Sequence, residues 1–399
     1  MRIGMMADMY KPHVSGITNY IALNKRYLEK AGHEVFVFAF GDLEYKDDLP
    51  RVVRSPGLPL VDTGYYFSFR YSQEAKSLLQ TMDIVHVHHP FVSGRLALRY
   101  CRPLRIPIVF TNHTRYDLYL QAYVPLLPDA FSETLLEAYM PPFCDAVDLV
   151  ISPSSGMAQV LRQLGVKSHI EIVPNGVELQ CFHRVTGPSK RNEHGFKPED
   201  ILLVYVGRLG PEKNLGFLIR AFAGVAQTLD NVHLIIIGGG PAEEALKHQV
   251  AQTSASDRIH FMGIVEYEQL PAYLAMCDAF ATASVSEVHP LSVIEAMATG
   301  LPVLGVHSVG VGDTVEDGIT GLLSTEDIAA FTAKMTRLCM DADLRRKMSE
   351  NARKASKQYH IERTTQIMLA HYERLASEAV NRNHGMGFRI RSFLERFKR

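Results

Sequence analysis

The segment Ser286–Gly305, SEVHPLSVIEAMATGLPVLG, holds two carboxylates eight residues apart, Glu287 and Glu295. The apolar run CDAFATAS before it predicts a short buried strand, and the run LPVLGV inside it predicts another. The expected order is therefore strand, loop, helix, strand. In an open α/β sheet, ligands bind at loops that leave the carboxyl ends of strands. The free amides at a helix N-terminus in such a loop suit a phosphate group.

Two cations share another predicted loop between a strand and a helix. The stretch GRLGPEKNLGFLIRAF carries Arg208 and Lys213 directly ahead of an amphipathic helix. An arginine offers a planar fork of donors and a lysine offers a point charge, so together they suit a diphosphate. Because charged surface loops are common, a solvated loop is an equal alternative on this motif alone.

Glycines mark two further loops. In MYKPHVSGITNY, Gly16 opens a predicted helix and would let the backbone approach a bulky anion, although a simple turn glycine is the favoured alternative. The run Gly238–Gly240 is followed by Pro241 and Ala242, so the dinucleotide pattern G-x-G-x-x-G fails. We interpret this run as a turn and expect no nicotinamide cofactor.

Histidines gather at the ends of two predicted strands. His113 follows the run PIVFT, where its ring could donate to a sugar hydroxyl or to a phosphate. The stretch HVHHP supplies His86, His88 and His89, and strand alternation places the first two on one face. A histidine buried in the core is the alternative for each of them.

Nothing in the sequence indicates a metal site. The five cysteines are scattered singly, without C-x-x-C spacing. Asp341 and Asp343 form a D-x-D, but they directly precede the stretch LRRKMSENARKASK, so helix capping explains them better than metal binding. We expect neither a metal nor any other cofactor.

Composition and length set the broad class of the protein. Lys and Arg total 42 and Asp and Glu total 43, and this balance argues against nucleic acid as a main partner. A chain of 399 residues can form two domains, each with its own core. The start MRIGMMAD predicts a strand rather than a secretory signal, and no apolar run approaches the ~20 residues that span a bilayer. Together with the unpaired cysteines, these features predict a cytoplasmic protein.

Short apolar runs alternate with helix-like stretches along the chain. In the first half the runs are RIGMMAD, HEVFVFAF, DIVHVHH, PIVFTNH, DLVISPS and IEIVPNG, and in the second half they are ILLVYVG, VHLIIIG, IHFMG, AFATAS, PVLGV and GLLS. This alternation predicts α/β domains with parallel sheets, and the polar stretch TGPSKRNEHGFKPED between the two series is typical of a linker. We expect one domain over residues 1–185, a second over 195–360, and a C-terminal helix with a basic tail over 361–399.

In combination, these motifs resemble the retaining glycosyltransferases of family 4 over nearly the whole chain. The specific features are the Glu-x7-Glu pair ending in EAMATGLPV, the loop with Arg208 and Lys213, and PNGVE at residues 174–178, all in the order and spacing of the family. The resemblance implies a GT-B fold, in which two doubly wound Rossmann-like domains face a central cleft and the C-terminal helix crosses back to the first domain.

The resemblance also implies a role for each residue singled out above. Arg208 and Lys213 would clamp the donor diphosphate with Gly16 facing it, Glu287 would hold hydroxyls of the transferred sugar, His113 would lie near that sugar, and Glu295 would hold the nucleotide ribose.

One position departs from the family pattern. Many members have glycine where this chain has Pro290, and proline offers no N–H. The amides of Leu291 and Ser292 would then hold the phosphate. The implied reaction is front-face attack by an acceptor hydroxyl, with the departing phosphate as the base and with retention of anomeric configuration.

The acceptor is indicated by a more local resemblance. The stretch NHTRYDLYLQAYVPLLP, which contains Tyr116 and Tyr119, resembles the subgroup that glucosylates diacylglycerol. It implies glucose from UDP-glucose as the transferred sugar and a lipid as the acceptor. The Tyr, Leu and Pro content suits an apolar substrate, and a buried helical hairpin is the equal alternative.

Two basic features favour an anionic membrane surface as a partner. Four arginines, Arg95, Arg99, Arg102 and Arg105, follow one side of a single predicted helix, and residues 382–399 hold six cations against one acid. At about 1 kcal/mol per cation near an anionic surface, these charges would give reversible binding. We therefore expect peripheral association with the inner face of the cell membrane. A solvated tail is the alternative.

Three other functions stay open at this point. A soluble acceptor, such as a sugar phosphate or a growing polysaccharide, would use the same donor site. A nucleotide-sugar epimerase could be built on the same fold, and it would isomerise the donor rather than transfer its sugar. A non-catalytic nucleotide-sugar sensor would bind the donor without turnover.

Overall fold

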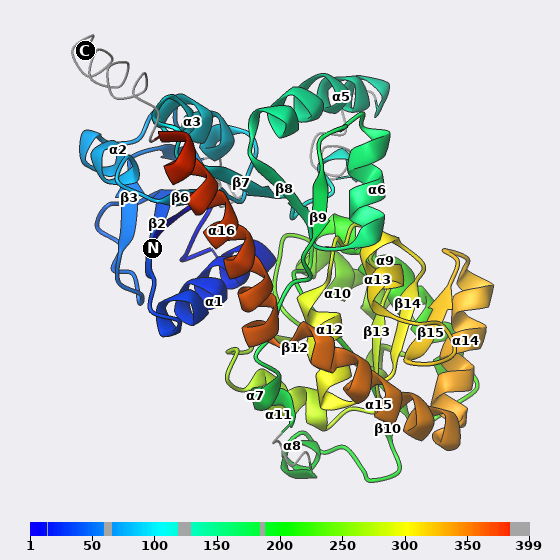
Figure 1. Ribbon diagram of the computed structural model, residues 1–399. Helices are drawn as coiled ribbons and strands as arrows, with labels where there is room; N and C mark the ends of the chain where they lie inside the picture. The colour runs from blue at the N-terminus through cyan, green and yellow to red at the C-terminus, as the bar shows by residue number, and fades with distance from the viewer. Residues whose placement is uncertain (14, 60–65, 119–128, 184–187, 384–399) are drawn as a thin grey trace. The chain divides into compact units, whose positions relative to one another are not determined.

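The computed structural model describes residues 1–13, 15–59, 66–118, 129–183 and 188–383 (Figure 1). Its contacts divide the chain into two compact units. The first unit consists of Met1–His113, Ala130–Pro174 and Ile361–Arg399, and the second consists of Thr114–Asp129 and Asn175–His360. Each unit is built around its own parallel sheet.

The sheet of the first unit has seven parallel strands in the order β3-β2-β1-β6-β7-β8-β9. Its strands are β1 (Arg2–Met6), β2 (Glu34–Phe40), β3 (Val52–Ser55), β6 (Ile84–Val87), β7 (Ile108–Thr111), β8 (Leu149–Ser152) and β9 (Ile170–Ile172). Leu58–Pro59 (β4) and Tyr66–Phe67 (β5) form a separate antiparallel pair. The helices are α1 (Gly16–Lys30), α2 (Gln73–Leu79), α3 (Val92–Tyr100), α5 (Asp129–Ala146), α6 (Ser155–Gln163) and α16 (Ile361–Asn383), with the 3₁₀ turn η1 (Arg102–Leu104).

The last helix, α16, belongs to the first unit although it follows the whole of the second unit in the chain. It packs against α1 and β6. Its Tyr372 is fully buried among the core residues of the first unit, and the ring lies edge-on to His86 of β6 with 5.7 Å between centroids. This return of the C-terminal helix confirms the prediction that it crosses back to the first domain.

The sheet of the second unit has six parallel strands in the order β12-β11-β10-β13-β14-β15. The strands are β10 (Ile201–Val206), β11 (Val232–Ile237), β12 (Ile259–Gly263), β13 (Ala279–Thr282), β14 (Val303–Val306) and β15 (Gly321–Ser324). The helices are α7 (Leu179–His183), α8 (Pro188–Glu193), α9 (Leu215–Ala226), α10 (Glu243–Ala251), α11 (Leu270–Ala275), α12 (Leu291–Thr299), α13 (Val309–Thr314), α14 (Ile328–Met340) and α15 (Ala342–Ser356), with 3₁₀ turns η2 (Pro211–Lys213), η3 (Ser256–Arg258) and η4 (Lys357–Tyr359). Two parallel sheets with crossover helices confirm the predicted α/β fold class.

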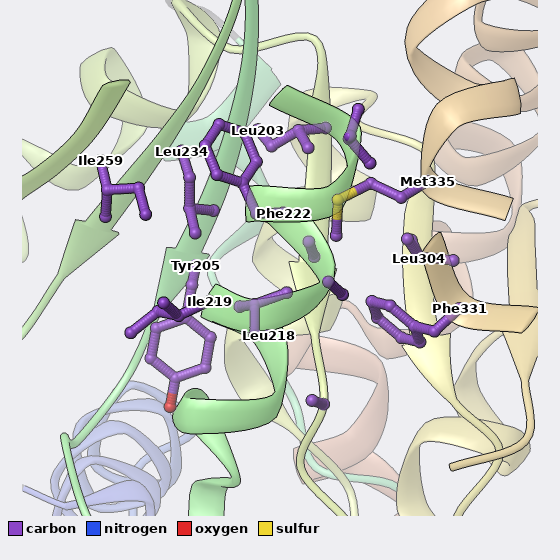
Figure 2. Close-up of a cluster of buried hydrophobic side chains, with 14 of the residues drawn as sticks. Leu203, Tyr205, Leu218, Ile219, Phe222, Leu234, Ile259, Leu304, Phe331 and Met335 are labelled. Atoms are coloured by element: carbon purple, nitrogen blue, oxygen red, sulfur yellow. The ribbon is translucent and has the colours of Figure 1, made fainter. Parts of the chain in front are cut away.

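One side of the second sheet is covered by α9 and α14. Figure 2 shows the side chains between them, with Phe222 of α9 lying among Leu203, Leu234 and Met335. Phe217 of α9 meets Phe331 of α14 edge to face, with 5.3 Å between ring centroids. Truncating a buried aromatic ring such as Phe222 to alanine costs about 3–5 kcal/mol. This packing anchors α9 and with it the loop that enters the helix.

Both sheets reverse their strand order at one point. In the first unit β1 pairs with both β2 and β6, and in the second unit β10 pairs with both β11 and β13. The crossovers from these central strands run in opposite directions, and sheets of this kind bind ligands at the carboxyl ends of the strands at such a point. The loops after β1, β6, β10 and β13 are therefore the expected ligand loops of the two units.

Two local features differ from the sequence prediction. The strand β3 was not predicted, because it has only four residues and its polar and apolar side chains do not alternate clearly. The four arginines from Arg95 to Arg105 do not lie on one helix, because α3 ends at Tyr100. Pro103, which has no N–H to continue the ladder, stands within η1, and Arg105 adopts a left-handed conformation with φ 57°.

Candidate active site

The backbone of the loop after β10 packs against the glycine run Gly238–Gly240. The N–H of Leu209 donates to the carbonyl oxygen of Gly239 at 3.0 Å. Gly238 has φ +135°, and a Cβ there would lie 1.9 Å from the carbonyl oxygen of Gly207. Sequence reasoning treated this run only as a turn, whereas the structure shows that it supports the backbone that carries Arg208.

The loop after β13 is fixed to two neighbouring segments. The hydroxyl of Ser286 donates to the carbonyl oxygen of Glu212 at 3.1 Å, and the N–H of Gly310 donates to that of Glu287 at 3.0 Å. A Cβ on Gly310 would lie 2.6 Å from the same oxygen of Glu287, so only glycine allows this approach. The backbone of Glu287 is therefore positioned by the start of α13.

These two loops bring together two of the predicted site residues. Nζ of Lys213, the last residue of η2, lies 2.6 Å from Oε1 of Glu287 and donates a charge-assisted hydrogen bond to it. Both side chains are mostly buried, with exposed fractions of 16% and 22%. Arg208 lies in the same loop as Lys213, and the hydroxyl of Tyr205 donates to its carbonyl oxygen at 3.2 Å. A cation and a carboxylate thus stand side by side at the switch point of the second sheet.

Helix α12 begins immediately after this loop. Pro290 is its N-cap residue, and Leu291 and Ser292 form its first turn. The N–H of Ile294 makes the first intrahelical bond, to the carbonyl oxygen of Pro290 at 3.2 Å. The preceding amides have no acceptor within the helix and can bind an anion. The carbonyl oxygen of His289 is held by the side-chain amide of Asn175 at 3.0 Å, which secures the approach to the helix.

Glu295 lies in the interior of α12 and does not meet Glu287 in any contact within the described residues. Its side chain is 6% exposed, and the hydroxyl of Tyr267 donates to its Oε1 at 3.1 Å. Burial raises the pKa of Glu295 to about 7, and the bond from Tyr267 opposes this shift. Tyr267 carried no sequence signal, because it lies in the connection after β12, which is distant in the chain.

In the first unit, the predicted His113 follows β7 and meets His88, which follows β6. Nδ1 of His88 lies 3.1 Å from Nε2 of His113. His86 uses both ring nitrogens, towards the hydroxyls of Tyr372 and Thr111. Burial lowers the pKa of His86 to about 3 and holds those of His88 and His113 well below their usual range, with neighbouring histidines adding to the effect. These three rings are therefore neutral.

Gly16 is the first residue of α1 and lies after the central strand of the first sheet. A Cβ added to it would have no heavy atom of the described residues within 4 Å. Ser15 caps the helix in a capping box with Thr18. One turn further along, the ring of Tyr20 packs against that of His113, with 4.7 Å between centroids. The start of α1 and His113 thus belong to one cluster.

The remaining predicted residues are placed as follows. Tyr116 lies three residues after His113 in the chain, is assigned to the second unit and is partly buried. Tyr119 and the basic tail beyond residue 383 lie outside the described residues. Asp341 accepts from the N–H of Leu344 at 2.8 Å as the N-cap of α15, which confirms its predicted role as a helix cap.

The described residues contain no group of three or more His, Cys, Asp or Glu side chains positioned to hold a metal ion. Among their helices, none combines the length and the apolar character that crossing a bilayer requires.

Comparisons with known proteins agree with this arrangement. The glycosyltransferase family 4 profile matches residues 14–180, and the profile of glycosyl transferases group 1 matches residues 188–355. The α-monoglucosyldiacylglycerol synthase of Streptococcus pneumoniae is 30% identical over 336 residues, which cover 81% of this chain and 75% of that protein. The chain belongs to glycosyltransferase family 4. The enzyme of the same name from Acholeplasma laidlawii is 27% identical to this glycosyltransferase over 377 residues, or 90% and 93% of the two chains.

Solved structures confirm the GT-B fold of this glycosyltransferase. Sucrose-phosphate synthase from Thermosynechococcus elongatus superimposes with a TM-score of 0.79 at 21% identity, covering 94% of this chain and 99% of that one. The Anabaena protein HepE, solved in complex with UDP and glucose, superimposes with a TM-score of 0.76 at 20% identity and with the same coverage.

Proposed function

We propose that this glycosyltransferase moves a hexose, with retention of configuration, from a nucleotide diphosphate sugar to a hydroxyl group of a membrane lipid. The observation that carries the proposal is the 2.6 Å contact between Lys213 Nζ and Glu287 Oε1. The contact supports the proposal because a cation suited to a diphosphate lies beside a carboxylate suited to sugar hydroxyls, at the switch point of the second sheet.

Arg208, Lys213 and the first amides of α12 would stabilise the leaving nucleoside diphosphate. As the bond to the sugar breaks, negative charge grows on the phosphate oxygen. Donors that are already in place stabilise this charge without reorganising, which is often the largest catalytic contribution. The amides of Leu291 and Ser292 would act where Pro290 has none.

The two glutamates would hold different parts of the donor. Glu287 stands outside α12, beside the clamp lysine, and would accept hydrogen bonds from hydroxyls of the transferred sugar. Glu295 is buried within the helix and would accept hydrogen bonds from the ribose. Neither glutamate serves as a nucleophile in this reaction, in which the acceptor hydroxyl attacks from the face of the leaving phosphate and gives its proton to that phosphate.

Gly16 and His113 would act on the donor from the first unit. No atom of the described residues would contact a Cβ at Gly16, which would let the diphosphate approach the start of α1. His113 is neutral, because burial holds its pKa well below the usual range, so it can donate one hydrogen bond to an oxygen of the sugar or of the phosphate.

The names of the relatives support a lipid acceptor and a glucosyl donor. Two relatives that match most of this chain are named α-monoglucosyldiacylglycerol synthase. We therefore propose UDP-glucose as the donor, diacylglycerol as the acceptor, and Tyr116 and Tyr119 as part of the acceptor region. The protein would act in the cytoplasm, peripherally bound to the anionic inner face of the cell membrane.

A soluble acceptor is the second candidate. The D-inositol 3-phosphate glycosyltransferase of Nocardia farcinica is 29% identical over 290 residues, which cover 70% of this chain and 64% of that protein. This relative favours a sugar phosphate or a similar soluble alcohol. An epimerase would return an isomerised nucleotide sugar with no acceptor product.

A matrix of donors and acceptors tests these alternatives directly. Purified protein is supplied with UDP-glucose, GDP-mannose or UDP-N-acetylglucosamine, together with either diacylglycerol in mixed vesicles or inositol 3-phosphate. We expect transfer from UDP-glucose to diacylglycerol, and an α-linked product by NMR. Transfer to the soluble alcohol alone would contradict the lipid acceptor, and a β-linked product would contradict retention.

Membrane docking is tested separately by co-sedimentation with vesicles. Full-length protein should sediment with anionic vesicles more than with neutral ones, and less at higher salt, because exposed charges are screened beyond about 10 Å at 0.1 M. Deleting residues 386–399 should weaken sedimentation and transfer to lipid while donor hydrolysis stays nearly unchanged. If neither protein sediments under any condition, the soluble acceptor becomes the better proposal.

A further inference from the structure

A pair of neutral histidine rings lies at the carboxyl end of the first sheet. Nδ1 of His88 and Nε2 of His113 are 3.1 Å apart, which is hydrogen-bonding distance. A neutral imidazole carries one N–H and one lone pair. One ring must therefore donate to the other, and the direction of this bond decides which nitrogen of His113 carries its proton.

The surroundings of His88 decide the direction. Its side chain is fully buried, and its Nε2 has no hydrogen-bond partner among the described residues. If His113 donated, the proton of His88 would sit on this Nε2 as a buried N–H without an acceptor. Orphaned buried N–H groups are rare, because such a donor loses its bond to water without gaining an acceptor in the protein. If His88 donates through Nδ1, its Nε2 carries only a lone pair.

The neighbouring His86 does not accept a hydrogen bond from Nε2 of His88. His86 lies with its ring 4.2 Å from that of His88, but its Nδ1 and Nε2 are already bonded to Tyr372 and Thr111. The backbone that carries the His88 ring is fixed as well, since the main-chain N–H of His88 donates to the carbonyl oxygen of Met6 at 2.9 Å. Tyr20 contacts the ring edge-on at 5.7 Å between centroids. The donor nitrogen of His88 therefore has one fixed target, His113.

We propose that His88 is a positioning residue that holds His113 as its Nδ1–H tautomer, so that His113 presents an N–H donor to an oxygen of the nucleotide-sugar donor. This inference rests on the function proposed above for His113. Nδ1 of His113 makes no hydrogen bond within the described residues, and the side chain is only partly buried. The opposite tautomer would direct a lone pair at a phosphate or hydroxyl oxygen, and an anionic oxygen would be repelled.

The consequence for the reaction is electrostatic. A fixed N–H donor strengthens its bond as charge grows on the leaving group, whereas a lone pair weakens the same contact. A histidine held as the wrong tautomer can lose several orders of magnitude in turnover, as in serine proteases that lack their orienting aspartate. We expect a smaller effect here, of at least about tenfold, because Arg208 and Lys213 carry most of the charge stabilisation in the proposed mechanism.

The tautomer can be measured without any enzyme assay. Full-length protein labelled with ¹⁵N-histidine is recorded in long-range ¹H–¹⁵N spectra, in which the two tautomers give different cross-peak patterns. His113 and His88 are assigned from the spectra of His113→Gln and His88→Asn. We expect both rings to carry the proton on Nδ1. A wild-type spectrum with the proton on Nε2 of His113 would overturn the proposal, whatever the protein transfers.

Three variants then test the positioning role. In His88→Asn the side-chain amide can still donate near the position of Nδ1, so kcat should stay within about threefold and His113 should keep its tautomer. In His88→Leu the donor is lost, so the tautomers of His113 should mix and kcat should fall at least about tenfold with little change in KM. His86→Asn is the matched control in the same core, which should lower thermal stability without changing the tautomer of His113.

The outcomes separate this inference from the proposed function. Equal kcat in His88→Asn and His88→Leu, with both folded by circular dichroism, would overturn the positioning role. Should His88→Leu fail to fold, the wild-type and His88→Asn spectra still decide the direction of the bond. Loss of transfer in His113→Gln with the predicted tautomers would support both claims. Absence of any transfer by the wild type would reject only the proposed function, since the spectrum does not depend on it.

Discussion

Lys213 and Glu287 form a hydrogen-bonded ion pair of 2.6 Å although 74 residues separate them in the chain. Neither side chain is more than 22% exposed, so water screens the pair only in part. The lysine proposed for the diphosphate is therefore balanced by the carboxylate proposed for the sugar. A bound diphosphate would bring negative charge, so that Lys213 could interact with both the diphosphate and Glu287. Glu287 could then also accept hydrogen bonds from sugar hydroxyls.

We predict that Lys213→Ala and Arg208→Ala each lower turnover about 10²-fold or more, because a preorganised donor to a developing anion contributes about 3 kcal/mol. Steady-state transfer assays measure the effect, and unchanged circular dichroism serves as the control for folding. Combining Lys213→Ala with Glu287→Gln should cost much less than the sum of the single changes, since the two groups contact each other. Near-normal turnover in both single cation variants would refute the diphosphate clamp.

We predict that nucleotide affinity rises with pH through about 7, because only ionised Glu295 accepts fully from the ribose and burial raises its pKa to about 7. Calorimetric titration with UDP from pH 5.5 to 8.5 measures this dependence. In Glu295→Gln the affinity should be lower at high pH and should lack the rise near pH 7. A rise that persists in Glu295→Gln would show that another group is responsible.

The carboxyl group of Glu295 should also make the stability of the fold depend on pH, but stability should fall where nucleotide affinity rises. Its pKa in the folded protein is higher than in the unfolded chain, so the unfolded chain loses this proton first and stability falls as pH rises from about 4.5 to about 7. We compare the free energy of unfolding of Glu295→Gln with that of the wild type at each pH. The difference in favour of the variant should be larger at pH 8.5 than at low pH by on the order of 3 kcal/mol. Urea titrations at both ends of the range measure the difference.

We predict that Tyr372→Phe destabilises the protein by about 1–3 kcal/mol, because it leaves Nδ1 of His86 buried without its partner. Thermal and urea unfolding measure the loss. The double variant Tyr372→Phe with His86→Leu is the matched comparison, and its cost should be less than the sum of the two single changes, since it removes both members of the pair. Strict additivity would show that the bond does not tie α16 to the sheet.

We predict that chelators leave transfer largely intact, since Arg208 and Lys213 can neutralise the diphosphate without a metal. Transfer is measured with and without EDTA after dialysis. Complete loss in EDTA that magnesium or manganese restores would contradict the prediction and would demand an unrecognised metal site.

Much of the local structure was predictable from residues close together in the chain. Every apolar run identified in the sequence became a strand, because most of these strands are buried and therefore show as continuous apolar segments. The strand β3 was missed, since its four residues include Arg54 and are mostly only half-buried. The continuous helix predicted across Arg95 to Arg105 was wrong, because Pro103 interrupts the hydrogen-bond ladder.

The sequence by itself determined the elements of the site and the chemical types on them: a loop with two cations, a carboxylate ahead of a helix N-terminus, and a histidine at a strand end. Only the tertiary structure decided their partners. Lys213 meets Glu287 because β10 pairs with β13, and His88 meets His113 because β6 pairs with β7. The choice of neighbouring strand depends on contacts between segments that are far apart in the chain, which no local pattern of burial or spacing encodes.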